Sequence, residues 1–210
     1  MRALAVLLAA SCALAACSTN SATEDTAPAG AMAADPNNPL MAPGYVAMSA
    51  SSDQFEIQSS QLALQASQNQ AVRNFANLMI AHHQATTQNL TAAAASAGLP
   101  PPPPTLMPQH QQMLDQLRAA GTGMAFDQAY KQAQIMSHQQ ALELQTNYAN
   151  GGDVPALKQV AASTAPIVQQ HLGAAQALNT DMGGMGAMQP GMDQSGQAPA
   201  TAPVRSGERG

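Results

Sequence analysis

Polar and apolar residues alternate along much of this chain at steps of three and four, which is the spacing of one face of an α-helix. The clearest stretch covers residues 70–98, and Gly98 there is a candidate C-terminal cap. Its apolar stripe is formed by Val72, Ala76, Met79, His83, Thr86 and Leu90. The pattern therefore predicts an amphipathic helix with a histidine in the middle of its buried face.

Three other long segments have the same period, at about 44–67, 124–149 and 153–178. Their stripes are, in order, Tyr45, Met48, Ser52, Phe55, Ser59, Leu62 and Ala66; Phe126, Tyr130, Ala133, Ser137, Ala141, Leu144 and Tyr148; and Leu157, Ala161, Thr164, Val168, His171, Ala175 and Leu178. Asp153 is a natural N-cap for the last helix, which Pro166 is expected to kink. Four such helices predict an all-α, up-and-down four-helix bundle over residues 44–180.

Glu56 has two interpretations of equal weight. It lies beside the stripe of the first segment and can point inward. Alternatively, the helix starts at Asp53, and Asp53-x-x-Glu56 is a capping box.

The connection between the second and third long helices contains a run of five prolines, Pro100 to Pro104, and then a short helical piece at 109–120. At about 3.1 Å per residue, the prolines extend over roughly 15 Å, enough to cross one end of a bundle. We expect a stiff connector here, with a recognition site for a partner as the weaker alternative.

Composition supports helices and limits the class of partner. Aromatic residues make up 3% of the 210 residues and charged residues 9%, so small aliphatic side chains and Met must form the core. Removal of the first 16 residues would leave six basic and twelve acidic residues. Because nucleic acids need clustered Lys and Arg, we expect no nucleic-acid binding.

The N-terminus predicts export. Residues 1–16 have a short positive end and an apolar stretch too short to span a bilayer, as in a secretory signal peptide. Leu14-Ala15-Ala16-Cys17 resembles a bacterial lipobox, which implies lipid attachment at Cys17 and, with Ser18 next, delivery to the outer membrane. The alternative is an ordinary signal peptide with an incidental cysteine. Residues 17–43 lack periodicity and are expected to be a flexible tether between the lipid and the domain.

Each long helix carries one candidate metal ligand on or beside its stripe: Glu56, His83, His138 and His171. In a bundle these four come to a similar depth, where imidazoles and a carboxylate suit copper or iron better than Mg²⁺ or Ca²⁺. Met79, one turn before His83, is a further candidate ligand. In a second interpretation the buried histidines only bond one another or the backbone and fix the register of the helices. In a third and simplest interpretation, His82, His83 and His110 are ordinary surface residues on solvated helix faces.

Two neighbouring features bear on this metal hypothesis. A ferritin-type di-iron centre needs Glu-x-x-His pairs, but Ile80 and Val168 stand three residues before His83 and His171, so a ferroxidase is not expected. Residues 181–210 form a Gly-, Met- and Pro-rich tail expected to be disordered. Its thioethers are weaker candidates for copper, namely Met182, Met185, Met188 and Met192.

Three blocks resemble one known family. They are 74–83 (Phe-Ala, then Met, then His-His), 126–138 (Phe-Asp-x-x-Tyr, then His138) and 165–172 (Pro-x-x-x-x-His-Leu). Together they resemble the bacterial domain-of-unknown-function 4142 family of exported proteins, in which His82 is usually Asp. The resemblance implies a ferritin-like bundle with a short extra helix between the second and third main ones, and no established activity.

The sequence contains no nucleophile with a base at a recognisable spacing and no phosphate-binding loop, so we expect no enzyme. The leading expectation is a lipid-anchored envelope protein facing the periplasm, structural or stress-related in role, whose membrane partner is reached through the lipid. The rival is a copper- or iron-binding protein.

Overall fold

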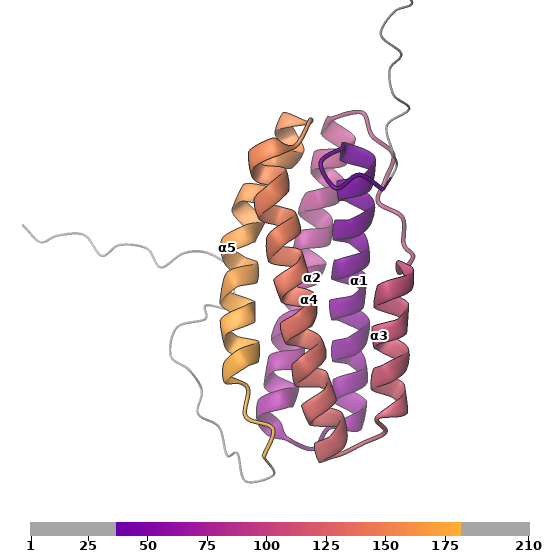
Figure 1. The fold of residues 1–210 in the computed structure, drawn as a ribbon, viewed down its shortest axis with the longest axis vertical. Helices are drawn as coiled ribbons and strands as arrows, with labels where there is room; N and C mark the ends of the chain where they lie inside the picture. Colours follow the sequence, from indigo (N-terminus) through magenta and orange to yellow (C-terminus); the bar gives the residue numbers. More distant parts are fainter. Residues whose placement is uncertain (1–36, 182–210) are drawn as a thin grey trace, which may run out of the picture. The chain divides into compact units, whose positions relative to one another are not determined.

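The computed structural model describes residues 37–181, and this part of the chain contains five α-helices and no strand (Figure 1). The all-α prediction is therefore confirmed for these residues. The helices are α1 (Ala42–Ala66), α2 (Gln70–Ser96), α3 (Pro108–Ala119), α4 (Met124–Gly151) and α5 (Pro155–Ala177). Among the described residues, no helix combines the length and apolar character that crossing a bilayer requires.

The four long helices pack as two hairpins, α1 with α2 and α4 with α5, with further contacts of α1 with α4 and of α2 with α5. The last turn of α1 meets the first turn of α4, where the Gly123 N–H donates to the Ala66 carbonyl. α2 and α4 consequently run in the same direction (Figure 1). A strictly alternating up-and-down order was therefore the wrong expectation for this pair.

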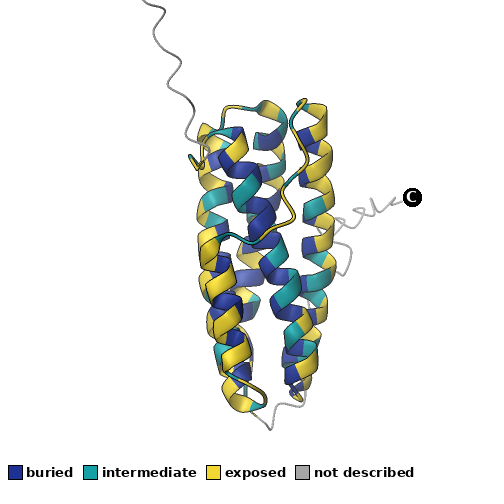
Figure 2. Ribbon diagram, turned by 90° about the vertical axis from the view of Figure 1, so that its right-hand side faces the viewer, coloured by how far each residue is buried: buried dark blue, intermediate teal, exposed yellow. Residues whose placement is uncertain are grey.

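The reason for that order is the long crossover between α2 and α4. The proline-rich connector does not only cross one end of the bundle but descends along α1 to reach α3 (Figures 1 and 2). The Ser51 hydroxyl oxygen of α1 accepts the Met107 N–H at 2.7 Å and lies 2.6 Å from His110 Nδ1, which fixes the start of α3. The chain thus returns along the side of the bundle before α4 begins.

The buried faces follow the predicted stripes closely (Figure 2). Every stripe residue of α2 and α5 is buried. On α1 and α4 the stripes are buried apart from Met48, Leu62 and Leu144, which are half-buried. The period of three and four therefore identified the interior of each helix.

The helix ends agree with the sequence less well. Gly98 has φ +70° and closes α2 with bonds from the Gly98 N–H to the Ala95 carbonyl and from the Leu99 N–H to the Ala94 carbonyl, a Schellman motif as expected of a glycine cap. The N-cap of α5 is Val154, and Asp153 instead accepts a hydrogen bond from the Tyr148 hydroxyl. α1 begins at Ala42, so Asp53 lies well inside the helix and the capping-box interpretation of Glu56 is wrong.

The apolar core is divided into two clusters along the bundle. The lower cluster, where α1 ends and α4 begins, contains Phe55, Val72, Phe75, Met79, Phe126 and Tyr130 among others. The upper cluster, at the other end, contains Tyr45, Val46, Leu90, Tyr148, Leu157 and Ala161 among others. Between them every long helix presents polar side chains, which we call the polar layer: Asp53 and Glu56, His82, His83, Thr86 and Thr87, Ser137 and His138, and His171.

Several sequence predictions fall outside the described residues. They are the signal peptide at 1–16, lipid attachment at Cys17, the tether up to residue 36, and the tail with Met182, Met185, Met188 and Met192. These remain predictions.

Candidate metal centre

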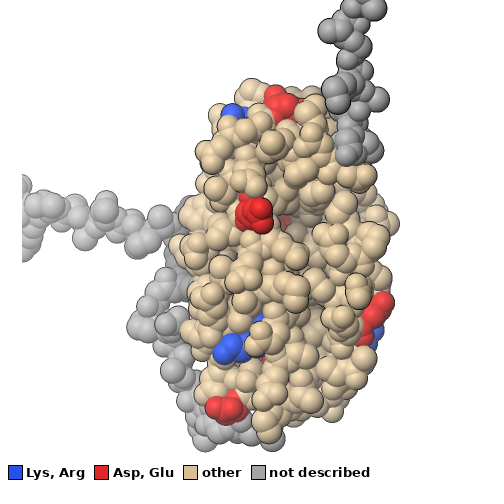
Figure 3. Space-filling view, in the orientation of Figure 1, with Lys and Arg blue, Asp and Glu red and all other residues tan. Residues whose placement is uncertain are grey.

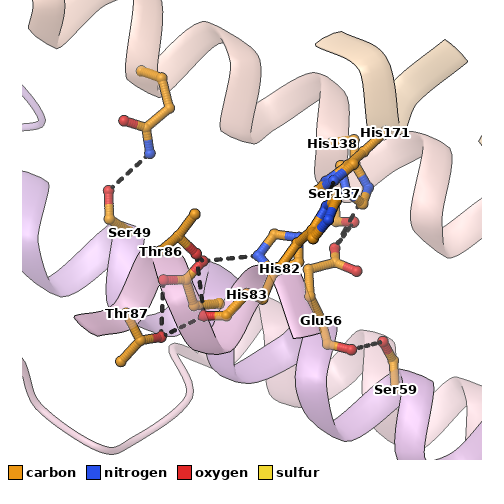
Figure 4. Close-up of polar contacts among 12 residues, drawn as sticks. Ser49, Glu56, Ser59, His82, His83, Thr86, Thr87, Ser137, His138 and His171 are labelled. Carbon is orange, nitrogen blue, oxygen red and sulfur yellow. Dashed lines mark hydrogen bonds and ion pairs between the residues drawn. The ribbon is translucent and has the colours of Figure 1, made fainter. Parts of the chain in front are cut away.

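Three histidines from three helices converge in the polar layer (Figure 4). His83 of α2, His138 of α4 and His171 of α5 each offer one ligand atom, and these atoms all lie within 4.8 Å of one another. The side chains are 3%, 1% and 1% exposed, respectively. The sequence prediction that these residues reach the same depth is confirmed. His83 and His138 are 55 residues apart along the chain, and His138 and His171 are 33 apart.

His83 is oriented by a carboxylate on the neighbouring helix. Its Nδ1–H donates to Asp53 Oδ1 at 2.8 Å, and the hydroxyl groups of Thr86 and Thr87 donate to the same carboxylate (Figure 4). Because a carboxylate only accepts, Nδ1 carries the proton and Nε2 is left with its lone pair. Such a carboxylate behind a histidine is the usual outer partner of a metal ligand.

His138 is held by its own helix. Its Nδ1–H donates to the Gln134 carbonyl at 2.7 Å, one turn earlier. Glu56 Oε1 lies 3.7 Å from the same nitrogen and accepts a short hydrogen bond from Ser137. The Nε2 atom of His138 is again the nitrogen left free.

His171 pairs with a fourth histidine. Its Nε2 lies 2.7 Å from His82 Nδ1, and the two rings stack with centroids 5.0 Å apart. The Nδ1 atom of His171 remains unpaired. If this nitrogen binds a metal ion, then His171 Nε2 must carry the ring proton, and the Nε2–H donates a hydrogen bond to His82 Nδ1.

Four buried atoms therefore lack a hydrogen-bond partner at one place: Nε2 of His83, Nε2 of His138, Nδ1 of His171 and Oε2 of Glu56. Buried polar atoms are nearly always paired, so such a group calls for an explanation. Three clustered imidazoles, each with an unpaired ring nitrogen, and a carboxylate beside them are the donor set of a transition-metal site. The residues present thus fit a bound ion.

The electrostatics favour the ligating form of two of the three histidines. Burial lowers the pKa of His138, although the charge of Glu56 opposes this effect. Burial lowers the pKa of His171 well below its ordinary value, and His83, His138 and His82 lower it further. Both rings are therefore neutral near pH 7, the state a metal requires.

His83 is shifted the other way. Burial lowers its pKa, but the hydrogen bond from His83 to Asp53 and the charges of Asp53 and Glu56 together outweigh burial, so the pKa is raised. An incoming cation must displace a proton here more often than at the other two rings. Metal uptake at this ring should accordingly release protons.

The remaining predicted residues are placed as follows. Glu56 points inward and is 1% exposed, in agreement with the inward interpretation. Met79 is fully buried in the lower apolar cluster, and its role as a ligand stays a prediction. The surface interpretation of His82, His83 and His110 is wrong, because His83 and His110 are buried and His82 is half-buried against His171.

Sequence reasoning missed two residues of this site. Asp53 was interpreted as a helix cap, and its Asp-x-x-Glu spacing gave no sign of a partner 30 residues away. His82 is adjacent to His83 but lies off the stripe, so the helical period placed it outside. The one signal in the sequence that could have pointed to His82 as a site residue is that it directly precedes His83. Asp127 is also buried with both oxygens unpaired, but it lies roughly 16 Å along α4 from His138 and belongs to another layer.

Comparisons with known proteins agree with the fold. The family model described as a domain of unknown function (DUF4142) matches residues 26–178. Among solved structures, the one described as CopM in the Cu(II)-bound form is similar with a TM-score of 0.55 and 18% sequence identity, covering 65% of this chain and 94% of that one. A search of curated proteins gave no significant match. At this identity the structural likeness speaks for the helical fold alone.

Proposed function

We propose that this chain, which belongs to the family described as a domain of unknown function (DUF4142), binds one transition-metal ion through His83, His138 and His171. Two observations carry the proposal: each of the three histidines has one buried ring nitrogen without a hydrogen-bond partner, and each offers a ligand atom within 4.8 Å of those of the other two. Hydrogen bonds within a purely structural cluster would be expected to use these atoms. Here each ring uses only its other nitrogen.

Copper is the first choice of metal, with iron as the alternative. Imidazole suits copper, iron and zinc, whereas Mg²⁺ and Ca²⁺ take sets of oxygen ligands. The absence of Glu-x-x-His pairs before His83 and His171 removes the carboxylates of a di-iron centre. The similar structure described as Cu(II)-bound supports the same choice by analogy of fold.

The finer architecture and the cellular setting belong to the same proposal. We assign the helices to the ferritin-like bundles, because α2 and α4 run parallel and are joined by one long crossover. Lipid attached at Cys17 would hold the domain at the outer membrane, facing the periplasm, with a structural or stress-related role and no catalysis. Labelling cells with a fatty-acid analogue tests this: wild type should carry the label and Cys17→Ser should not.

Metal titration of the purified Cys17→Ser chain without an affinity tag tests the site. We expect one equivalent of copper, as Cu(I) or Cu(II), to bind with a Kd below about 1 μM, and Fe(II) and Zn(II) serve as competitors. His171→Gln should abolish this binding. His110→Gln is the matched control, because His110 is also a buried, hydrogen-bonded histidine but lies on α3 outside the triad.

A second variant separates the bundle from the tail. Replacing Met182, Met185, Met188 and Met192 by leucine should leave the affinity of the first equivalent unchanged. Loss of all binding in that variant would move the site to the tail thioethers. Binding weaker than micromolar in every form would leave a lipid-anchored scaffold with a structural role.

A further inference from the structure

The three histidines of the candidate metal centre, His83, His138 and His171 (the triad), are buried, so an ion needs a path to them from solvent. All three rings are at least 97% buried. Two of the sides that border the triad can be compared: the α1–α4 side, where Glu56 and Ser137 lie, and the α2–α5 side, where His82 lies. The two sides differ in what stands between solvent and the imidazoles.

On the α1–α4 side there is a pocket with a volume of about 210 Å³. It lies between α1, the start of α3 and α4, on the face seen in Figure 3, most of which is uncharged. Its walls include Met48 and Ser52 from α1, His110 from α3, and Ser137, Ala141 and Glu143 from α4. Glu143 is the one acidic side chain in this lining and can attract a cation.

The floor of this pocket leads directly to the triad. Ser137 lines the pocket and donates a hydrogen bond to Glu56 Oε1 (Figure 4). That oxygen lies 3.7 Å from His138 Nδ1, while Glu56 Oε2 has no partner. Only one hydroxyl group and one carboxylate therefore separate the pocket from the first histidine.

The hydroxyl group has a second acceptor. Ser137 Oγ also lies 3.3 Å from the Gln134 carbonyl, to which it can donate when it leaves Glu56. The carboxylate freed in this way has both oxygens available to a cation. The Ser137 hydroxyl can thus turn its hydrogen away from Glu56 without leaving that hydrogen unpaired.

The α2–α5 side differs from the α1–α4 side. His82 covers His171, its Nδ1 is used in the bond to His171, and its Nε2 is buried. The pocket on the α1–α4 side does not reach this side, because none of its lining residues belongs to α2 or α5.

From this arrangement we propose that the pocket between α1, α3 and α4 is the loading site for the metal ion, and that Glu56, whose carboxylate lies beside His138, is the transit ligand that passes the ion to the three histidines. The inference rests on the proposed function, since it needs an ion at the triad. In this route Glu56 determines how fast the metal ion enters and leaves the site, whereas the three histidines determine the affinity.

Stopped-flow measurement of Cu(II) binding and of its removal by a chelator tests this route, with the copper absorption band as the readout. Ala141→Met fills the pocket from α4 and Ser52→Leu fills it from α1. We expect each to slow both association and dissociation at least about tenfold while Kd stays within about twofold. Ala125→Met is the control, because Ala125 is an exposed alanine on the same helix.

Two further variants complete the test. Glu143→Gln should slow association several-fold at low salt and have no effect at high salt, as expected for an exposed charge that steers a cation. Wild-type rates in both filled variants, or slower exchange only in His82→Phe, would overturn the route while leaving metal binding intact. Failure of the wild-type chain to bind copper would instead overturn the proposed function itself.

Discussion

The polar layer and the two apolar clusters beside it are built on the same helices yet do opposite things. The clusters bury large side chains such as Phe126 and Leu157, both 0% exposed, and this burial stabilises the bundle. The polar layer buries nitrogen and oxygen atoms without partners. Each such atom costs about 1–3 kcal/mol. The stability of the fold therefore comes from the two clusters, and the polar layer between them lowers the free energy of unfolding.

The largest expected effect tests the stabilising half of this comparison. Leu157→Ala in the upper cluster should lower the free energy of unfolding by about 2–5 kcal/mol, since it removes a buried side chain and leaves a cavity. The copper affinity of the folded protein should not change. Urea unfolding and copper titration measure the two quantities. A large loss of affinity would show that the cluster and the layer are coupled.

Metal binding should remove the instability of the layer. Copper at 100 times its Kd should raise the free energy of unfolding by about 2.7 kcal/mol. This increase should persist in Leu157→Ala and disappear in His138→Gln. Calorimetric melting with and without copper measures it, and an equal rise in His138→Gln would contradict the site.

Loss of an outer partner should have a smaller effect. Asp53→Asn keeps the size of the side chain but weakens the acceptor that holds His83, so copper affinity should fall about 10- to 100-fold. Asp115→Asn is the control, because Asp115 is an exposed carboxylate on α3 whose partners, Arg118 and Gln111, lie on the same helix. Equal affinities in the two variants would mean that Asp53 has no part in orienting the ligand.

Acid should weaken the metal-free protein. Since burial lowers the pKa values of His138 and His171 below the ordinary 6.5, the unfolded chain binds more protons, and stability is lost as the pH falls below about 6.5. His83 acts in the opposite sense, because its raised pKa adds stability at low pH that is lost as the pH rises through that pKa. Burial lowers the pKa values of His82 and His110 as well, so four lowered rings oppose one raised ring.

The net slope of this acid effect should be at most about 1.4 kcal/mol per pH unit for each histidine. Urea unfolding between pH 7 and pH 5 measures it. His171→Gln should flatten the slope below about pH 6.5, whereas His83→Gln should steepen it only above that pH, where the raised pKa of His83 acts. The same slope in both variants would show that these rings are not the groups responsible.

The sequence predicted the helices and three of the site residues for one reason: a residue on an apolar stripe must face the interior. His171 stands in strict register between Val168 and Ala175, and all three are buried. What the helical period cannot supply is the partner across the bundle. The bond between Asp53 and His83 and that between His82 and His171 join residues 30 and 89 positions apart, and neither pair has a local signature. The parallel course of α2 and α4 was missed because the direction of a long connection is set by packing.

Because histidines and carboxylates interrupt the apolar core, the two ends of the bundle need not lose order together. The upper cluster around Tyr45, Tyr148 and Leu157 and the lower cluster around Phe55 and Phe126 are separate groups of packed apolar residues. Amide hydrogen exchange should then show two blocks that open separately, and the amides of the less stable block should exchange faster. An ion bound to α2, α4 and α5 would cross-link the blocks and merge them into one cooperative unit.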